Sequence, residues 1–161
     1  MRSSEMPLLE FYRTYDQWKE EHDDLHARLI ELCRFLTEKP APDEHTDWDA
    51  RHRLVRDTFL PFMEDWLRHL SRERATIYPF AQRATCGGAI GPIPVLEQDQ
   101  RIVDQFYESY LIAAYRGESA EELLSRLLQV LMVIAEHFRV EDETVLPATE
   151  KLMDEIEYSG S

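Results

Sequence analysis

One amphipathic segment, residues 119–147, has the sequence SAEELLSRLLQVLMVIAEHFRVEDETVLP. Ser119, followed three positions later by Glu122, matches a capping box and predicts that a helix begins there. The apolar residues that follow recur at spacings of three and four: Leu123, Leu127, Val130 or Leu131, Ile134 and Val145. His137 and Glu141 fall in phase with this apolar stripe. The segment therefore predicts a long helix whose buried face carries an imidazole and a carboxylate about one turn apart.

The same His-x-x-x-Glu arm occurs a second time, as His69-Leu-Ser-Arg-Glu73. Like the first arm, it lies near the end of an apolar-periodic segment and is followed by a proline, Pro79 here and Pro147 there. A neutral imidazole and a carboxylate held one turn apart form a bidentate arm for a transition metal. One such arm is common on helices of a glutamate-rich chain, whereas two arms in phase with two apolar stripes indicate a metal site.

The apolar periodicity predicts four core helices, over about residues 8–37, 50–82, 94–116 and 120–146. The signals expected to delimit them are Lys39-Pro-Ala-Pro42, a cap at Asp47 or Asp49, the glycine-rich stretch ATCGGAIGPIP, and Gly117. Pro61 is expected to bend or interrupt the second helix. The expected fold is all-α: an antiparallel up-and-down four-helix bundle with a short C-terminal helical extension, forming a single domain over residues 1–161.

Six polar residues lie on the inward faces of these helices: His22, His69, Glu73, Asp99, His137 and Glu141. An unpaired polar group in a core costs roughly 2–7 kcal/mol, so something must satisfy them. Imidazole and carboxylate ligands suit iron, manganese or zinc. Of the other histidines, His26 borders the first stripe, where it could support a ligand from behind or be a spare ligand, and His45 and His52 are expected to be solvated.

Composition limits the choice of partners and location. The chain has 161 residues, with 18 Lys and Arg against 32 Asp and Glu and a formal charge of -14. This charge disfavours nucleic acid and anionic membrane surfaces as partners. No apolar run of about eighteen residues and no secretion signal core occur, which predicts a soluble cytoplasmic protein. Cys33 and Cys86 form no CxxC pair.

Three blocks of the sequence together resemble the hemerythrin-like, or HHE cation-binding, family. They are Glu21-His22-Asp-Asp-Leu25, His69-Leu-x-x-Glu73 with Ile77-Tyr-Pro79, and His137-Phe-x-x-Glu141-Asp142 with Leu146-Pro147. The resemblance implies a four-helix bundle that holds an oxo- or hydroxo-bridged non-haem di-iron centre. It also implies that His22 and His69 bind one iron, that Glu73 and Glu141 bridge, and that His137 binds the other iron.

The third helix departs from this family pattern. The family usually supplies histidine there, whereas this chain has Leu96-Glu-Gln-Asp99-Gln-Arg-Ile102. Asp99 stands where the family histidine is expected, and Val103, four positions later, cannot bind metal. Asp99 could replace the histidine, Glu97 could reach in from a rotated helix, a water could fill the position, or only one metal could bind tightly.

Loss of imidazole makes the site harder and more anionic, which favours ferric iron and leaves an open coordination position. We therefore expect a non-haem iron protein that reacts with or senses oxygen, peroxide or nitric oxide. If it is an enzyme, we expect a di-iron oxidoreductase. The alternatives are a metal-dependent sensor or interaction module without turnover, and a metal-free structural bundle. Tyr107 and Tyr110 are the hydroxyls nearest in sequence to Asp99 that could contact a bound oxygen species.

Overall fold

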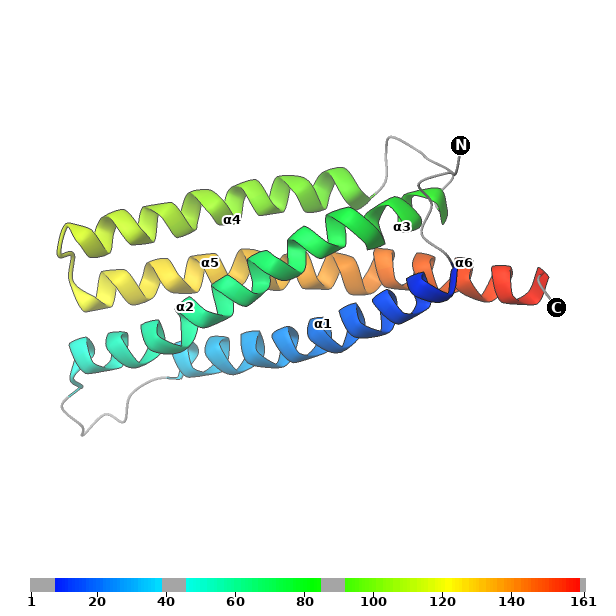
Figure 1. Cartoon of the computed structure of the whole chain (residues 1–161). Coiled ribbons are helices and arrows are strands. Elements are labelled where there is room, and N and C mark those ends of the chain that lie inside the picture. The colour runs from blue at the N-terminus through cyan, green and yellow to red at the C-terminus, as the bar shows by residue number, and fades with distance from the viewer. Residues whose placement is uncertain (1–7, 39–45, 85–91, 160–161) are drawn as a thin grey trace.

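The computed structural model describes residues 8–38, 46–84 and 92–159, and these residues fold into a helical bundle (Figure 1). The helices are α1 (Leu8–Thr37), α2 (Trp48–Arg72), the π-helix η1 (Glu73–Ile77), α3 (Tyr78–Ala84), α4 (Pro92–Tyr115), α5 (Ala120–Val140), the π-helix η2 (Glu141–Val145) and α6 (Leu146–Ser159). Consecutive long helices run in opposite directions, so the predicted all-α antiparallel bundle is confirmed. The predicted loops at 39–45 and 85–91, with His45 and Cys86, lie outside the described residues.

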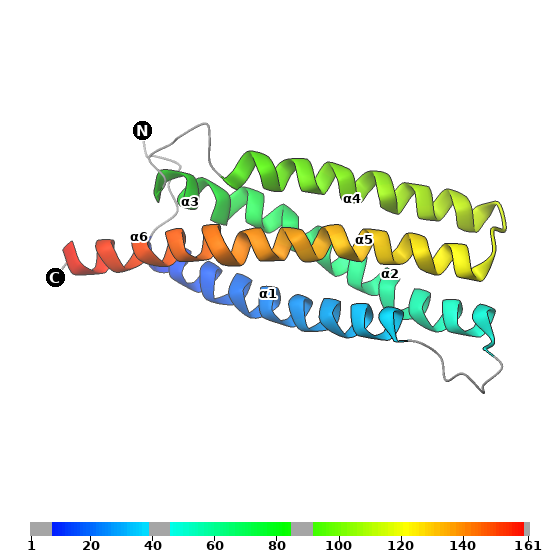
Figure 2. The same cartoon turned by 180° about the vertical axis from the view of Figure 1, so that it is seen from behind.

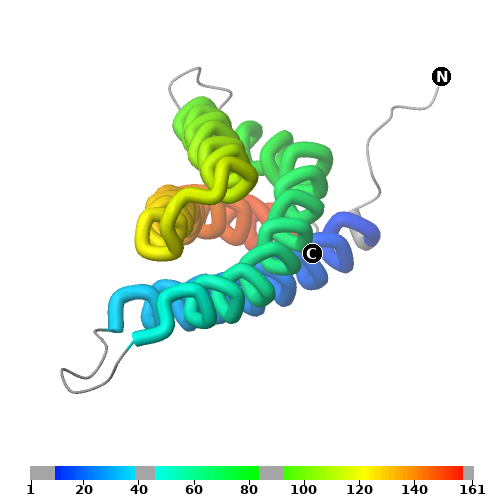
Figure 3. The backbone as a smooth tube through the Cα atoms, turned by 90° about the vertical axis from the view of Figure 1, so that its left-hand side faces the viewer, coloured from blue at the N-terminus to red at the C-terminus, as the bar shows by residue number. Residues whose placement is uncertain are grey.

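The long helices pack unevenly around the bundle. Helix α4 packs mainly on α5, and α1 packs on both α2 and α5. In the end-on view α4 lies beside α5 and α1 beside α2 (Figure 3). From behind, α6 continues the line of α5 beyond the end of α4, where it packs against α3 (Figure 2). Among the described helices, none is long and apolar enough to cross a membrane.

Local signals in the sequence set several helix ends. The Asp47 side chain accepts a hydrogen bond from the Ala50 N–H at 3.0 Å, and Ser119 Oγ accepts one from the Glu122 N–H at 3.3 Å. Gly117 has a φ of +75°. The N–H of the next residue, Glu118, donates a hydrogen bond to the Ala113 carbonyl at 3.1 Å, so that α4 ends in a Schellman motif. The predicted caps at Asp47 and Ser119 and the stop at Gly117 are therefore confirmed.

Pro61 does not interrupt α2, which runs without a break from Trp48 to Arg72. The proline lies on the exposed side of the helix. The hydrogen bond that it removes would have gone to the carbonyl of Asp57, also an exposed residue, where water can satisfy the oxygen. The expected interruption at this position is therefore wrong, whereas the alternative, a bend, stays a prediction.

Two apolar clusters form the core. The large cluster comprises Leu25, Leu29, Leu32, Val55, Phe59, Phe62, Met63, Trp66, Leu70, Val103, Tyr110, Ala113, Leu123, Leu124, Leu127, Val130, Leu131, Ile134 and Phe138. The small cluster comprises Phe11, Tyr15, Trp18, Ile77, Tyr78, Ala81, Ile93, Leu96 and Val145. Along the chain the members of the two clusters are separated by short gaps, and the polar residues described below lie in these gaps or directly beside them.

His52 is a buried residue rather than the solvated one that the sequence predicted. Its Nε2 lies 2.8 Å from the Tyr110 hydroxyl, so the pair links α2 to α4 inside the large cluster. The residue follows the first turn of α2 on the same face as Val55 and Phe59, which brings it inward. Burial, helped by the charge of Arg56, lowers the pKa of His52.

We expect His52 to make folding stability depend on pH. Since its folded pKa is depressed, its stabilising contribution is present above the unfolded pKa of about 6.5 and is lost as the pH falls. The advantage of the wild type over His52→Gln in unfolding free energy should shrink between about pH 8 and about pH 5. Chemical denaturation across that range measures it. Tyr110→Phe, which keeps the imidazole, should retain the pH dependence, and a constant difference for His52→Gln would contradict the prediction.

Candidate metal centre

A buried polar layer separates the two apolar clusters. On α1, His22 lies between Trp18 of the small cluster and Leu25 of the large one. His69, Glu73, His137 and Glu141 occupy the corresponding level on the other helices, and each of the five side chains is at most 2% exposed. Five of the six residues predicted for the site therefore come together at one level of the bundle.

These five side chains form two trios that share one member. The first trio is His22, His69 and Glu73, and the second is Glu73, His137 and Glu141; within each, one donor atom per residue lies within 4.8 Å of the others. Within each arm the imidazole contacts the carboxylate: His69 Nε2 lies 3.0 Å from Glu73 Oε1, and His137 Nε2 lies 2.7 Å from Glu141 Oε1. The trios also touch, because Glu141 Oε2 lies 3.3 Å from His22 Nδ1. This grouping agrees with the division that the family resemblance implies for the three histidines and for Glu73, whereas Glu141 belongs to one trio only.

A π-helix begins at the glutamate of each arm. The N–H of Tyr78 donates to the Glu73 carbonyl and that of Leu146 to the Glu141 carbonyl, five residues back in both cases. The next residue is a proline each time, which cannot donate and whose ring would clash with the carbonyl four residues earlier. The wider turn relieves that clash. Single π-turns of this kind are frequent at functional sites.

Both imidazoles of the first trio contact, through one ring nitrogen, a carboxylate that is outside the trio. His22 Nε2 lies 2.8 Å from Asp142 Oδ1, and His69 Nδ1 lies 3.5 Å from Glu21 Oε2. Their other ring nitrogens, His22 Nδ1 and His69 Nε2, are buried and make no hydrogen bond, although each lies close to a carboxylate oxygen of the centre, at 3.3 Å and 3.0 Å respectively. Metal-binding histidines commonly have this arrangement, one nitrogen on a carboxylate and the other on the metal. The donor set therefore fits a metal ion.

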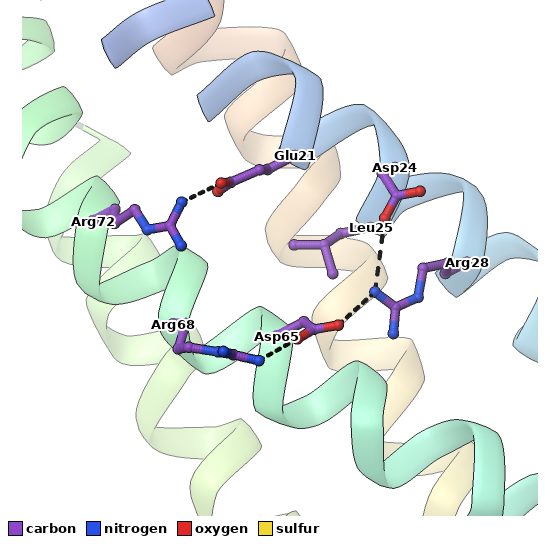
Figure 4. Close-up of a pocket in the computed structure, with 7 residues that line it drawn as sticks. All are labelled: Glu21, Asp24, Leu25, Arg28, Asp65, Arg68 and Arg72. Atoms are coloured by element: carbon purple, nitrogen blue, oxygen red, sulfur yellow. Dashed lines mark hydrogen bonds and ion pairs between the residues drawn. The ribbon is translucent and has the colours of Figure 1, made fainter. Parts of the chain in front are cut away.

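Glu21 is itself anchored by a charged pocket between α1 and α2 (Figure 4). Arg72 forms an ion pair with Glu21. Further along the pocket, Asp65 pairs with Arg28 at 2.9 Å and with Arg68 at 2.5 Å. Exposed ion pairs contribute little to stability. The effect of the Arg72 pair is to hold the Glu21 carboxylate in place against His69.

The electrostatics of the centre favour protons on His137 and Glu141, in the second trio, but not on His22 or Glu73. Burial lowers the pKa of His22. Burial also opposes protonation of His137, but Glu141 and Glu73 outweigh it and raise its pKa to about 10. Burial and the charge of Glu73 raise the pKa of Glu141, whereas the adjacent imidazoles of His137 and His69 outweigh burial and lower the pKa of Glu73. A metal cation would replace these protons in balancing the carboxylates.

Tyr78 is a residue of the centre that the sequence analysis missed. Its hydroxyl lies 2.8 Å from Glu141 Oε1, 3.0 Å from Glu73 Oε2 and 3.4 Å from His137 Nε2. Burial and the two carboxylates raise the pKa of the phenol far above its usual range. In an α-helix the fifth residue after Glu73 would point away from it, and only the wider π-turn brings the two onto one face. Pro79 was the one signal in the sequence that could have indicated this.

Trp18 covers the first trio from the side of the small cluster. Its Nε1 donates to Glu73 Oε1 at 3.1 Å. Its ring stacks on both imidazoles, with centroids 4.9 Å from His22 and 5.4 Å from His69. Trp18 therefore forms the wall of the centre on this side.

Asp99 lies at the level of the polar layer but in neither trio. On α4 it falls between Leu96 of the small cluster and Val103 of the large one. It is half-buried, its Oδ2 is buried without a hydrogen-bond partner, and burial raises its pKa. Its role as a ligand stays a prediction.

The structure does not show the other arrangements that the sequence suggested for the third helix. Glu97 is exposed, so the rotated helix that would bring it inward is not observed. The Tyr110 hydroxyl binds His52, and the Tyr107 ring packs on Phe59 in the large cluster. The expectation that these two hydroxyls serve the centre is therefore wrong, because both side chains are directed toward the large cluster. His26 stacks on Phe138, and its Nδ1 lies 3.8 Å from Oδ2 of Asp142, the carboxylate that also contacts His22.

This fold and centre define a class of protein: a four-helix bundle with a buried histidine–carboxylate cluster able to hold metal ions. The family model for the hemerythrin HHE cation-binding domain matches residues 13–149. The chain therefore belongs to the hemerythrin HHE cation-binding domain family. Comparison with curated proteins and with solved structures gave no significant match.

Proposed function

We propose that the protein binds a pair of iron ions and uses them to react with oxygen, peroxide or nitric oxide. The observation that carries the proposal is Glu73, a carboxylate shared by two buried trios and thus suited to bridge two cations. The family match supports cation binding. The mixture of imidazole and carboxylate donors, with no cysteine among them, favours iron, with manganese and zinc as the competing ions.

The two trios differ in a way that favours reactivity over oxygen carriage. Such a centre, when loaded, supplies redox chemistry and an open position for a small ligand. The first trio has two imidazoles, whereas the second has His137 alone. Trp18 and Trp66 border the imidazoles and exclude water from the layer. An oxidoreductase is therefore our first candidate.

Loading the purified protein with iron tests this proposal. We expect close to two irons per chain, a coupled di-iron Mössbauer spectrum, and consumption of oxygen or peroxide by the reduced protein. Parallel loading with manganese and zinc ranks the three metals. A metal content near zero after iron supplementation would favour the metal-free bundle. Reversible oxygen binding with a bleachable band and no turnover would favour a carrier.

A sensor without turnover is the second candidate. Contacts between the buried centre and the protein surface favour it. His22 and His69 each contact a carboxylate that reaches the surface, Asp142 at 38% exposure and Glu21 at 31%. Changes at the centre can therefore reach the charged pocket through Glu21 and Arg72. Hydrogen exchange at α1 and α2 that follows iron or oxygen, with no substrate consumed, would favour this function over the enzyme.

Removing the carboxylate behind His22 should weaken metal binding without removing a ligand. For Asp142→Ala we expect an affinity loss of about 10–100-fold, because the imidazole loses the partner that fixes its orientation. Competition with a chelator measures it. Glu143→Ala is the matched control, since Glu143 is the next residue in η2 but is exposed and pairs with Arg139. Equal affinities for the two variants would contradict the prediction.

A further inference from the structure

Tyr78 brings a phenol to the one trio that lacks a second imidazole. Its three polar contacts are with Glu73, His137 and Glu141, which are the members of the second trio. The residue is 5% exposed, so its hydroxyl is enclosed by these donors. We propose that Tyr78 is itself a metal ligand, its phenolate oxygen binding a ferric ion held by the second trio. This inference rests on the iron-binding function proposed above.

The other arm shows that packing does not require a hydroxyl at this position. Leu146, the first residue of α6, occupies the matched place after η2, five residues after Glu141 and directly before Pro147. It is half-buried and packs against the small cluster, of which Tyr78 is a member. The two arms therefore share the π-turn and the proline, but only η1 directs an oxygen atom into the centre.

The position also corresponds to the gap in the family pattern. Helix α4 supplies no histidine: Glu97 is exposed, Val103 belongs to the large cluster, and Asp99 is in neither trio. The Tyr78 hydroxyl, at 3.4 Å from His137 Nε2, lies on the side of the centre where His137 is the only imidazole. The chain therefore offers a donor at Tyr78, the first residue of α3, where α4 offers no imidazole.

The chemistry of the ligand matches a ferric ion. A phenolate oxygen is a hard anionic donor, like the carboxylates beside it. On binding, the O–H bond of Tyr78 breaks, its proton leaves to solvent, and the oxygen forms a bond to the cation. No electron is transferred in this step. The positive charge of the cation compensates the phenolate and the two neighbouring carboxylates.

The test is spectroscopic and does not depend on turnover. Ferric-loaded wild type should show a visible phenolate-to-iron charge-transfer band, with tyrosinate ring modes in the resonance Raman spectrum excited within it. Tyr78→Phe, loaded with excess iron, should lose the band at least tenfold while metal analysis still finds bound iron. Tyr110→Phe is the matched control: it removes another buried phenol, which binds His52 in the large cluster, and should keep the band.

The outcomes separate this inference from the function on which it rests. Wild type without bound iron would overturn both. Wild type with two irons but no tyrosinate modes, or Tyr78→Phe with the band intact, would overturn the Tyr78 ligand alone. If Tyr78→Phe does not fold, the unsubstituted chain can instead be labelled with ring-deuterated tyrosine, and its resonance Raman ring modes can be compared with those of the unlabelled protein. Unshifted ring modes would then exclude a tyrosine ligand, and shifted modes that persist in Tyr15→Phe and Tyr110→Phe would support Tyr78.

Discussion

Glu73→Gln is expected to reduce metal affinity more than any other single substitution in the protein. Glu73 is common to both trios, so the change removes one anionic donor from each. Loss of an outer partner of a ligand already costs about 10–100-fold in affinity, and loss of a shared ligand should exceed the upper end of that range. Metal analysis after iron loading and desalting, with chelator competition, measures the effect.

The fold should survive this substitution, because the glutamine oxygen can still accept the hydrogen bond from Trp18, and its amide NH2 can donate to the Tyr78 hydroxyl, which keeps Glu141 as an acceptor. Circular dichroism and thermal unfolding of the metal-free variant check this point. Glu97→Gln is the control, since Glu97 is an exposed carboxylate on α4. A Glu73→Gln protein that keeps both irons with wild-type affinity would remove Glu73 from the centre.

Trp66→Ala is expected to cause the largest loss of folding stability. The indole is fully buried in the large cluster, and its ring meets the His137 ring edge-on with centroids 5.7 Å apart. Truncating a buried tryptophan leaves a cavity and costs about 3–5 kcal/mol. Denaturant unfolding of the metal-free proteins measures the difference, so that metal binding does not contribute to it.

Leu67→Ala is the matched control for Trp66. Leu67 is the next residue of α2 but is 39% exposed, so its truncation should cost far less, on the order of 0.5 kcal/mol. Similar losses for the two variants would contradict the assignment of α2's buried face. In addition, Trp66→Ala should weaken metal binding modestly, because His137 loses a packing neighbour.

The sequence predicted the bundle because the information for it is local. Apolar residues at spacings of three and four define each buried face, and caps such as Asp47 and Ser119 define helix starts. The two histidine–glutamate arms were visible for the same reason, since four residues span about one turn. His52 was mispredicted because its partner, Tyr110, lies 58 residues away.

The sequence by itself thus determined the helical bundle and five of the side chains that meet in the buried polar layer. Only the tertiary structure decided how these five divide into two trios around Glu73, and that Glu97 faces solvent. It also decided that Tyr78 joins them. The physical reason is that a periodic pattern assumes a regular helix, whereas the prolines after both arms widen the turn and change which residue faces the centre.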